Sequence, residues 1–445
     1  MALHAVPNSE GKTMMRLNRS KNALTLTALA ATVAMVATVI PAQASTDKVG
    51  VTSNLIKLGI SQPTDGPASA GYNKVAPAMK AYFDYVNANG GINGRKIELK
   101  IENDGYLVQN AVNKSIKLVD DGIFAFVGSL GTANNLNVAS ALDLKNTKIP
   151  SLFVNTGYSG FAVKRDHPSM FALFPSYYME TKIIGEYIKK NFPNKKVGII
   201  YQADDFGDDG LAGLKQAGIT LAKEVPYASL SQADPRSAPA WITQLNSAGV
   251  EVAIMFGVTS ATAAALGAAA RARYAPQWIL GSVGSDVTTL NALGITNNIL
   301  NGAITGSFLP ATTDTRDSYI KLFREVNTKY NPGVAFDSNV LAGMNTAFVT
   351  AAAIKAAGPN LTRSGLIRTI ETKGRSFQSA SLTPLTYSTT SHAGYAGFWL
   401  GTFNSSGVLV PETGKYKVYT TDSAKGKVVV STYKRPAVSG KGLFK

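Results

Sequence analysis

The strongest constraint on the fold of this chain is a regular alternation of two kinds of segment that begins at Leu55. Short runs rich in β-branched residues, with the length of buried strands, are separated by longer stretches with the spacing of amphipathic helices. The first predicted strands are 56–61, 97–102, 124–127 and 150–154, and the helices between them are 72–88, 108–120 and 134–144. Strands that alternate with helices in this way indicate βαβ units on a parallel sheet.

A second series with the same alternation begins after Pro175. Strands are predicted at 196–201, 220–225, 252–256 and 278–281, with helices at 178–191, 207–217, 238–247 and 259–271. A short extended run follows at 302–307, and then helices at 315–329, 337–357 and 363–372. Since single hydrophobic cores stop growing near roughly 250–300 residues, a chain of 445 residues needs more than one. We therefore expect an α/β protein with two doubly wound lobes.

The first 44 residues have the order of an export signal. Basic residues between Arg16 and Lys21 precede an uncharged stretch, 23–40, and small residues end at Ala44, which is what export and cleavage require. We expect residues 1–44 to be a cleavable signal peptide and the protein to be periplasmic or on the outside of the cell envelope. The apolar stretch exceeds the roughly 7–15 residues of a typical leader, so an uncleaved anchor is the alternative. Translation starts either at residue 1 or at Met14 or Met15.

The composition argues against an enzyme, a cofactor or a metal. Cysteine is absent, and His167 and His392 are the only histidines after the leader. This excludes thiolate sites and leaves little for His-based metal or nucleophile sites. No strand is followed by GxGxxG or GxxxxGK[ST], and nothing reads GxSxG. The acidic run 204–210 departs from EF-hand spacing, so we interpret it as a solvated loop with an N-capping aspartate.

The formal net charge of +16 does not indicate nucleic acid, because the basic residues are dispersed and no aromatic-interleaved basic run precedes the C-terminus. The basic residues gather only after Lys415, and we treat 421–445 as a basic C-terminal tail. One interpretation is a weak contact with anionic polymer or lipid of the cell envelope. The interpretation that we favour is a pair of edge strands, 416–420 and 428–433, with a frayed end.

Small and polar residues follow the predicted strands at their carboxyl ends, where doubly wound sheets bind ligands. Gly128–Thr132 leaves one strand and enters a helix, so its free backbone N–H groups and hydroxyls can hold a carboxylate at the positive end of the helix dipole. Asn155–Tyr158 is a second loop of this kind.

Five segments carry a resemblance to a known family: 84–95, 126–129, 149–157, 174–177 and 200–207. In their order and spacing the chain resembles the type 1 solute-binding proteins of ABC importers, specifically the branched-chain amino acid (Leu/Ile/Val-type) binding protein family. The resemblance extends from about Leu55 to Gly407, which is nearly the whole chain after the leader.

The resemblance implies two Rossmann-like lobes joined by three crossover hinge segments, with a ligand in the cleft between them. We expect the crossovers near 174–176, 305–307 and 383–387. Lobe 1 is then 45–174 with 307–383, and lobe 2 is 175–306 with 384–420.

The function implied is that of a monomeric, non-enzymatic receptor. It would close over a small-molecule ligand by a hinge motion and deliver it to the permease subunits of an ABC importer, driven by their ATPases. The alternatives are a ligand-sensing receptor domain and an exported α/β enzyme.

The resemblance also places ligand contacts on this sequence. The carboxylate-binding hydroxyl of the family falls at Thr132, which could instead only cap its helix, and the aromatic residue of the second lobe falls at Phe206. Neighbouring positions in the same loops complete the set. The predicted contacts are Tyr72, Ser129, Thr132, Asn155, Thr156, Tyr158, Phe206 and Val283.

At Val283 the chain departs from the pattern, because amino-acid binders of the family have an acidic residue there for the ligand ammonium. Valine cannot neutralise an ammonium, and an unpaired buried charge costs several kcal/mol. Asp286 or Asp205 could substitute. Otherwise the ligand is a carboxylate or amide without an amine, and the sequence alone leaves its identity open.

Overall fold

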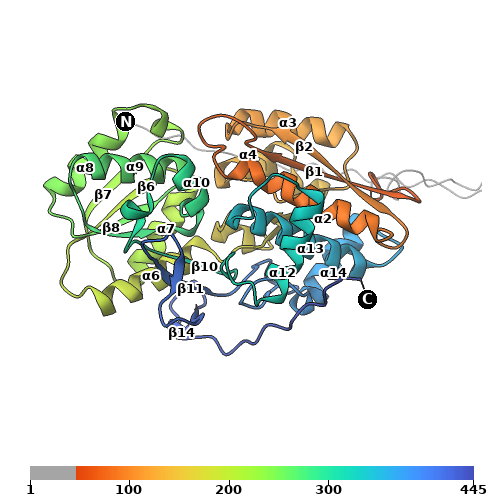
Figure 1. Ribbon diagram of the computed structural model, residues 1–445. Helices are drawn as coiled ribbons and strands as arrows, with labels where there is room; N and C mark the ends of the chain where they lie inside the picture. The colour runs from red at the N-terminus through yellow and green to blue at the C-terminus, as the bar shows by residue number, and fades with distance from the viewer. Residues whose placement is uncertain (1–46, 445) are drawn as a thin grey trace, which may run out of the picture. The chain divides into compact units, whose positions relative to one another are not determined.

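Two separate β-sheets organise the computed structural model, which describes residues 47–444 (Figure 1). The expected α/β fold with two lobes is confirmed. The leader, the alternative anchor and the candidate start sites lie outside the described residues.

Lobe 1 is built on a parallel sheet with the strand order β2-β1-β3-β4-β5. The strands are β1 (Leu55–Gln62), β2 (Lys96–Asn103), β3 (Ala125–Val127), β4 (Ser151–Val154) and β5 (Met170–Ala172). The helices of this part of the chain are α2 (Val75–Ala88), α3 (Val108–Asp120), α4 (Thr132–Ala141) and α5 (Leu144–Thr147). Later in the chain come α12 (Ser318–Tyr330), α13 (Ser338–Ala357) and α14 (Arg363–Lys373).

Lobe 2 has a larger, mixed sheet with the order β14-β13-β11-β10-β9-β8-β6-β7, and β12 pairs with β11. Its parallel strands are β6 (Val197–Gln202), β7 (Leu221–Tyr227), β8 (Val252–Phe256), β9 (Gln277–Leu280) and β10 (Ile304–Ser307). Antiparallel β11 (Phe398–Phe403), β12 (Leu409–Pro411), β13 (Val418–Thr420) and β14 (Val429–Val430) extend it. The helices are α6 (Tyr177–Asn191), α7 (Asp205–Gln216), α8 (Ser237–Ser247), α9 (Thr259–Arg271), α10 (Val287–Ala292) and α11 (Asn297–Leu300).

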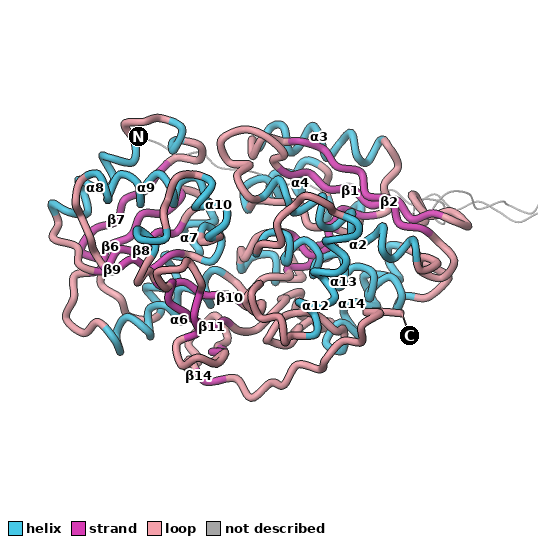
Figure 2. Tube along the Cα trace, viewed as in Figure 1, coloured by secondary structure: helices cyan, strands magenta, loops and turns pink. Residues whose placement is uncertain are grey.

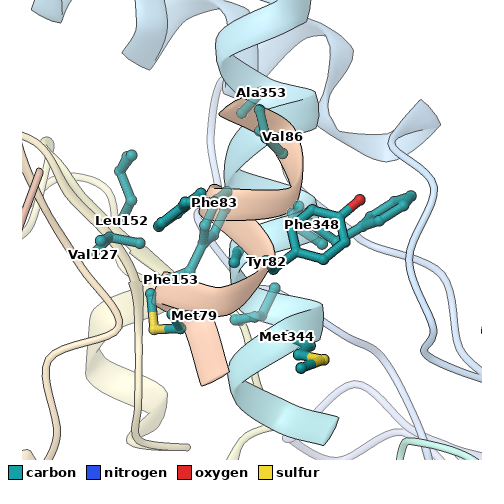
Figure 3. Packing of buried hydrophobic residues seen from close by; sticks show 14 of the residues in the cluster. Met79, Tyr82, Phe83, Val86, Val127, Leu152, Phe153, Met344, Phe348 and Ala353 are labelled. Atoms are coloured by element: carbon teal, nitrogen blue, oxygen red, sulfur yellow. The ribbon is translucent and has the colours of Figure 1, made fainter. Parts of the chain in front are cut away.

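The core of lobe 1 forms where α2 packs against both α13 and the sheet (Figure 3). Tyr82 and Phe83 of α2 are buried among aromatic and aliphatic side chains, and the rings of Tyr82 and Phe348 lie 5.7 Å apart. Gly343 permits the close approach of the helices, because a Cβ there would lie 2.5 Å from the Val75 carbonyl oxygen. Burial of such side chains contributes roughly 1.5–3 kcal/mol each.

Among residues 47–444, α13 alone has the length and hydropathy of a membrane span. Most of the helix is buried inside lobe 1, where Met344 and Phe348 are fully enclosed. Core helices of globular domains have the same composition, so its hydropathy is explained by packing.

The chain passes between the lobes at positions that differ in part from those expected. The first passage joins β5 to α6 through residues 173–176. Residues 305–307 belong to β10 of lobe 2, and the chain enters the lobe 1 core at Phe308. The third expected segment, 383–387, lies inside lobe 1, because Leu385, Tyr387 and Tyr395 are buried in its core. The passage to β11 therefore follows Tyr395, and 384–395 belongs with lobe 1, not lobe 2.

The C-terminal tail makes a fourth passage. The expected edge strands are present as β13 and β14, and the buried ammonium of Lys182 holds this end of the tail by bonding Thr421, Asp422 and the carbonyls of Ala424 and Gly426. The chain then returns to lobe 1 as a loop (Figure 2).

The expected frayed end is wrong, because the end of the tail packs on lobe 1. Val438 is 7% exposed and belongs to the lobe 1 core, and Phe444 packs edge-on against Tyr85. Arg435 pairs with Asp317, bonds the Ala380 carbonyl and lies over the Tyr319 ring. These contacts involve residues far apart in sequence, so no local pattern could predict them.

Replacing Arg435 should therefore destabilise lobe 1. We expect Arg435→Ala to lower the free energy of unfolding by about 1–3 kcal/mol in urea titrations, because the Asp317 carboxylate loses a charged partner in a largely buried place. Lys434→Ala, an equal change of charge at an exposed neighbour, is the control and should stay within about 0.5 kcal/mol. Equal effects of the two variants would contradict the docking of the tail.

Candidate functional site

A cavity of about 210 Å³ lies where the carboxyl ends of the parallel strands of both sheets meet. In lobe 1 the chain passes from β1 to β2 on one side and then to β3 on the other side of β1. In lobe 2 it passes in the same way from β6 to β7 and then to β8 on the other side of β6. Such switch points leave a crevice between the loops that follow neighbouring strands. The loops after β1, β3, β4, β6, β8 and β9 all contribute lining residues.

Two backbone features bring Thr132 and Asn155 to the lobe 1 wall. Gly131 adopts φ 98°, and a Cβ there would lie 3.0 Å from the Tyr106 ring, so the turn into α4 requires glycine. Phe153 has φ 55° at an irregularity in β4, after which Asn155 pairs with Leu130 and its carbonyl accepts the Gly131 N–H at 3.3 Å. The residues at the start of α4, Gly131 and Thr132, consequently line the cavity. The first N–H groups of a helix have no partner within the helix.

Five of the eight predicted contacts line the cavity: Tyr72, Thr132, Asn155, Phe206 and Val283. The other three do not line it. Thr156 Oγ1 is 2.6 Å from Thr132 Oγ1, so it orients that hydroxyl, while the Ser129 hydroxyl accepts the Ser61 N–H at 3.3 Å. Tyr158 packs edge-on against Phe161. The cap of α4 is Gly131, and the Thr132 hydroxyl does not cap the helix.

The aromatic side of the cavity is held by packing of tilted rings within lobe 2. The buried ring of Phe206 lies 4.6 Å from that of Tyr177 and 4.9 Å from that of Phe256. Asp204 fixes the start of α7, since its Oδ1 accepts the Phe206 N–H at 3.0 Å, as the expected capping aspartate of the acidic run does. The expected solvated loop is wrong, because residues 205–210 form the first turns of α7 and Asp209 is buried there. Asp205 is exposed and does not line the cavity.

Hydrogen bonds join the two lobes around the cavity. Tyr72 of lobe 1 donates its hydroxyl to the Val283 carbonyl at 2.8 Å. The Asp286 carboxylate of lobe 2 accepts the N–H of Ser338 at the start of α13, at 3.2 Å, and also the Ser338 hydroxyl. The Ser159 N–H donates to Asp209 of α7 at 3.0 Å. The lobes therefore touch on several sides of the cavity.

Comparison with known proteins gives this architecture a family. The family model described as "Periplasmic binding protein" matches residues 55–424. The chain belongs to the periplasmic binding protein family. This family consists of solute-binding receptors, and the resemblance to its Leu/Ile/Val-type members is confirmed.

Among the relatives of this periplasmic binding protein is the Leu/Ile/Val-binding protein homolog 3 of Brucella melitensis. It is 26% identical over 342 residues, which cover 75% of this chain and 88% of the relative. A branched-chain amino acid ABC transporter structure from Thermus thermophilus with bound valine superposes with a TM-score of 0.73 at 19% identity, covering 84% and 98% of the two chains. A fatty acid ABC transporter substrate-binding protein from Thermomonospora curvata gives 0.72 at 20% identity, covering 88% and 97%. At these identities the structural likeness shows the fold alone.

One residue that positions the site of this binding protein escaped the sequence analysis. Glu180 of α6 is buried behind the cavity wall, and its two carboxylate oxygens accept the Ser282 N–H at 2.7 Å and the Ser282 hydroxyl at 2.8 Å. Burial raises the pKa of this carboxyl to about 7, although both bonds from Ser282 lower it. An acidic residue three positions after Tyr177 and four before Ile184, on the apolar face of a helix, is the signal that could have revealed it.

The raised pKa makes stability depend on pH. Between about pH 4.5 and 7 the folded state holds a proton on Glu180 that the unfolded state has released, so the free energy of unfolding falls as pH rises through this window. Glu180→Gln keeps one acceptor and one donor for Ser282 and removes the charge. Its stability relative to the parent should rise by on the order of 2–3 kcal/mol across the window, measured by chemical unfolding at several pH values. Glu186→Gln, on the outside of the same helix, should show no such trend, and a flat difference for Glu180→Gln would refute this assignment.

Proposed function

We propose that this protein is the extracytoplasmic solute-binding receptor of an ABC importer, which takes a small ligand into the cavity between its lobes and closes over it by a hinge motion. The observation that carries the proposal is the cavity itself. It lies at the carboxyl edges of both sheets, and residues of both lobes line it. A molecule bound there contacts both lobes at once, so it stabilises their closed arrangement relative to an open one.

The connecting segments support the hinge. Phe174 lies on the first passage, Phe308 follows the second and Trp399 follows the third, and all three line the cavity. A change in the angle between the lobes therefore changes the shape of the site. A ligand that binds the closed arrangement more tightly than the open one shifts the equilibrium toward the closed arrangement, to an extent set by the difference between the two affinities.

The importer role is inferred from relatives. The named relatives include Leu/Ile/Val-binding proteins and ABC transporter proteins. In an importer of this kind, the permease subunits would recognise the closed form of the receptor, and the ATPase subunits would drive transport. Export to the periplasm or the outer envelope agrees with the leader-like residues 1–44. The predicted ligand contacts that line the cavity, with Thr132 and Asn155 as polar anchors, belong to the same proposal.

Ligand-induced closure is the direct test. Compounds are first screened by thermal shift on residues 45–445, and a binder should raise the melting temperature according to its concentration relative to Kd. Small-angle X-ray scattering should then show a smaller radius of gyration with ligand than without. Binding that leaves the scattering curve unchanged would contradict the hinge, and a protein that binds no small solute would contradict the receptor.

Thr132 tests the polar anchor. Thr132→Val keeps the shape and removes the hydroxyl, so we expect Kd to rise about tenfold, the usual effect of losing one hydrogen bond of about 1.4 kcal/mol. Calorimetric titration measures it. Thr243→Val, the same substitution on an exposed face of α8, is the control. An unchanged affinity in Thr132→Val would remove this residue from the site.

A further inference from the structure

We infer that the cavity takes a ligand with a hydrocarbon body that ends in a carboxyl or carboxamide group and carries no ammonium group. The inference rests on the proposed function, because it concerns the same cavity. It excludes free α-amino acids as the preferred ligands.

The first step concerns the only acid on the wall. Within residues 47–444, Asp286 is the sole acidic residue that lines the cavity, and no lysine, arginine or histidine lines it. Asp286 Oδ1 accepts the N–H and the hydroxyl of Thr289, at 2.8 and 2.6 Å, and Oδ2 accepts the N–H and the hydroxyl of Ser338. Four donors fill the roughly four acceptor positions of a carboxylate. To bind an ammonium, Asp286 would have to uncap α10 or release α13 of the other lobe.

The second step concerns the acids behind the wall. Both carboxylate oxygens of Glu180 are held by Ser282, and Glu180 does not line the cavity. Burial raises the pKa of this carboxyl to about 7, so its negative charge is only partly present near neutral pH. Four other acids that are buried or partly buried also have hydrogen-bond or ion-pair partners, and none of the four lines the cavity. They are Asp104 with Ser61, Asp204 with Gln202, Asp209 with Ser159, and Asp337 with Lys74.

The third step concerns Val283, the position on the cavity wall where the ammonium group of an amino acid would need a negatively charged partner. Val283 is half-buried, packs against two hydrophobic clusters, and lines the cavity in a loop that is fixed by Tyr72 and Glu180. An ammonium here would lose its water shell without gaining a charged partner, at a cost of several kcal/mol. A hydrocarbon group would gain from burial instead.

The fourth step concerns the polar end of the ligand. The start of α4 offers donors to a ligand, because Gly131 and Thr132 line the cavity and the first N–H groups of a helix have no partner within the helix. Asn339 also lines the cavity, and its buried Nδ2 has no partner among the described residues. Donors are satisfied by carbonyl or carboxylate oxygens. The ligand therefore presents acceptors at this end and apolar atoms elsewhere.

A matched series of compounds tests this on the unaltered protein. The series compares leucine with 4-methylpentanoate and 4-methylpentanamide, and phenylalanine with 3-phenylpropanoate and 3-phenylpropanamide, by calorimetric titration. We expect the better of the acid and the amide to bind at least tenfold more tightly than the amino acid of the same skeleton. The comparison of acid with amide identifies the polar end. Tighter binding of leucine or phenylalanine would overturn the inference while leaving the receptor function intact.

Val283 provides the converse test. Val283→Asp supplies the missing charge and should gain at least tenfold in affinity for leucine relative to 4-methylpentanoate, whereas Val283→Asn, of similar size and uncharged, should not. Native mass spectrometry of the purified parent protein gives an independent readout, and a bound molecule with an amino group would overturn the inference. If no compound of any class binds and none is carried through purification, the proposed receptor function fails as well.

Discussion

The Asp286 carboxylate is the interaction on which the geometry of the cavity depends. With one oxygen it caps α10, and with the other it binds the first residue of α13, so a single buried group fixes a loop of lobe 2 and the start of the longest core helix of lobe 1. Removing the carboxylate from such a network leaves buried donors without an acceptor, and this lowers the stability of the folded protein. The charge that might have bound a ligand instead holds the two lobes together.

Charge is consequently distributed very unevenly in this protein. The whole chain has a formal net charge of +16, yet within the described part, residues 47–444, no basic residue lines the cavity and the one acid that lines it is fully hydrogen-bonded. The positive field of the whole molecule attracts anions to the surface from a distance, but selection inside the cavity depends on hydrogen-bond donors and shape. This separation fits a ligand held by neutral groups, as the structure of the Thr132 loop suggests.

The parts of the fold that follow from local pattern were predictable, and those that depend on long-range contacts were not. The alternation of strands and helices predicted nearly every parallel strand, with α3 and α9 at the same residues that the structure shows. It missed β11, because antiparallel pairing with β10 is set by residues almost one hundred positions apart. In the site, the rule that ligands bind at strand carboxyl ends predicted the loops that place Thr132 and Asn155 on the wall, and the family resemblance predicted Phe206. No pattern could say that Ser129 and Thr156 do not line the cavity, or that Glu180 supports the loop at Ser282.

The fourth passage between the lobes limits how far the proposed hinge can open. The tail is attached to lobe 2 through Lys182 and to lobe 1 through Arg435 and Val438, and the residues between these attachments must stretch as the lobes separate. A chain segment reaches at most about 3.3–3.6 Å per residue, so a short segment that is already extended allows little further separation. In a hinge with only three short connections nothing beyond the cleft limits opening. Here the anchored tail adds a restraint, and part of the free energy that orders the tail on lobe 1 also favours lobes that stay close together.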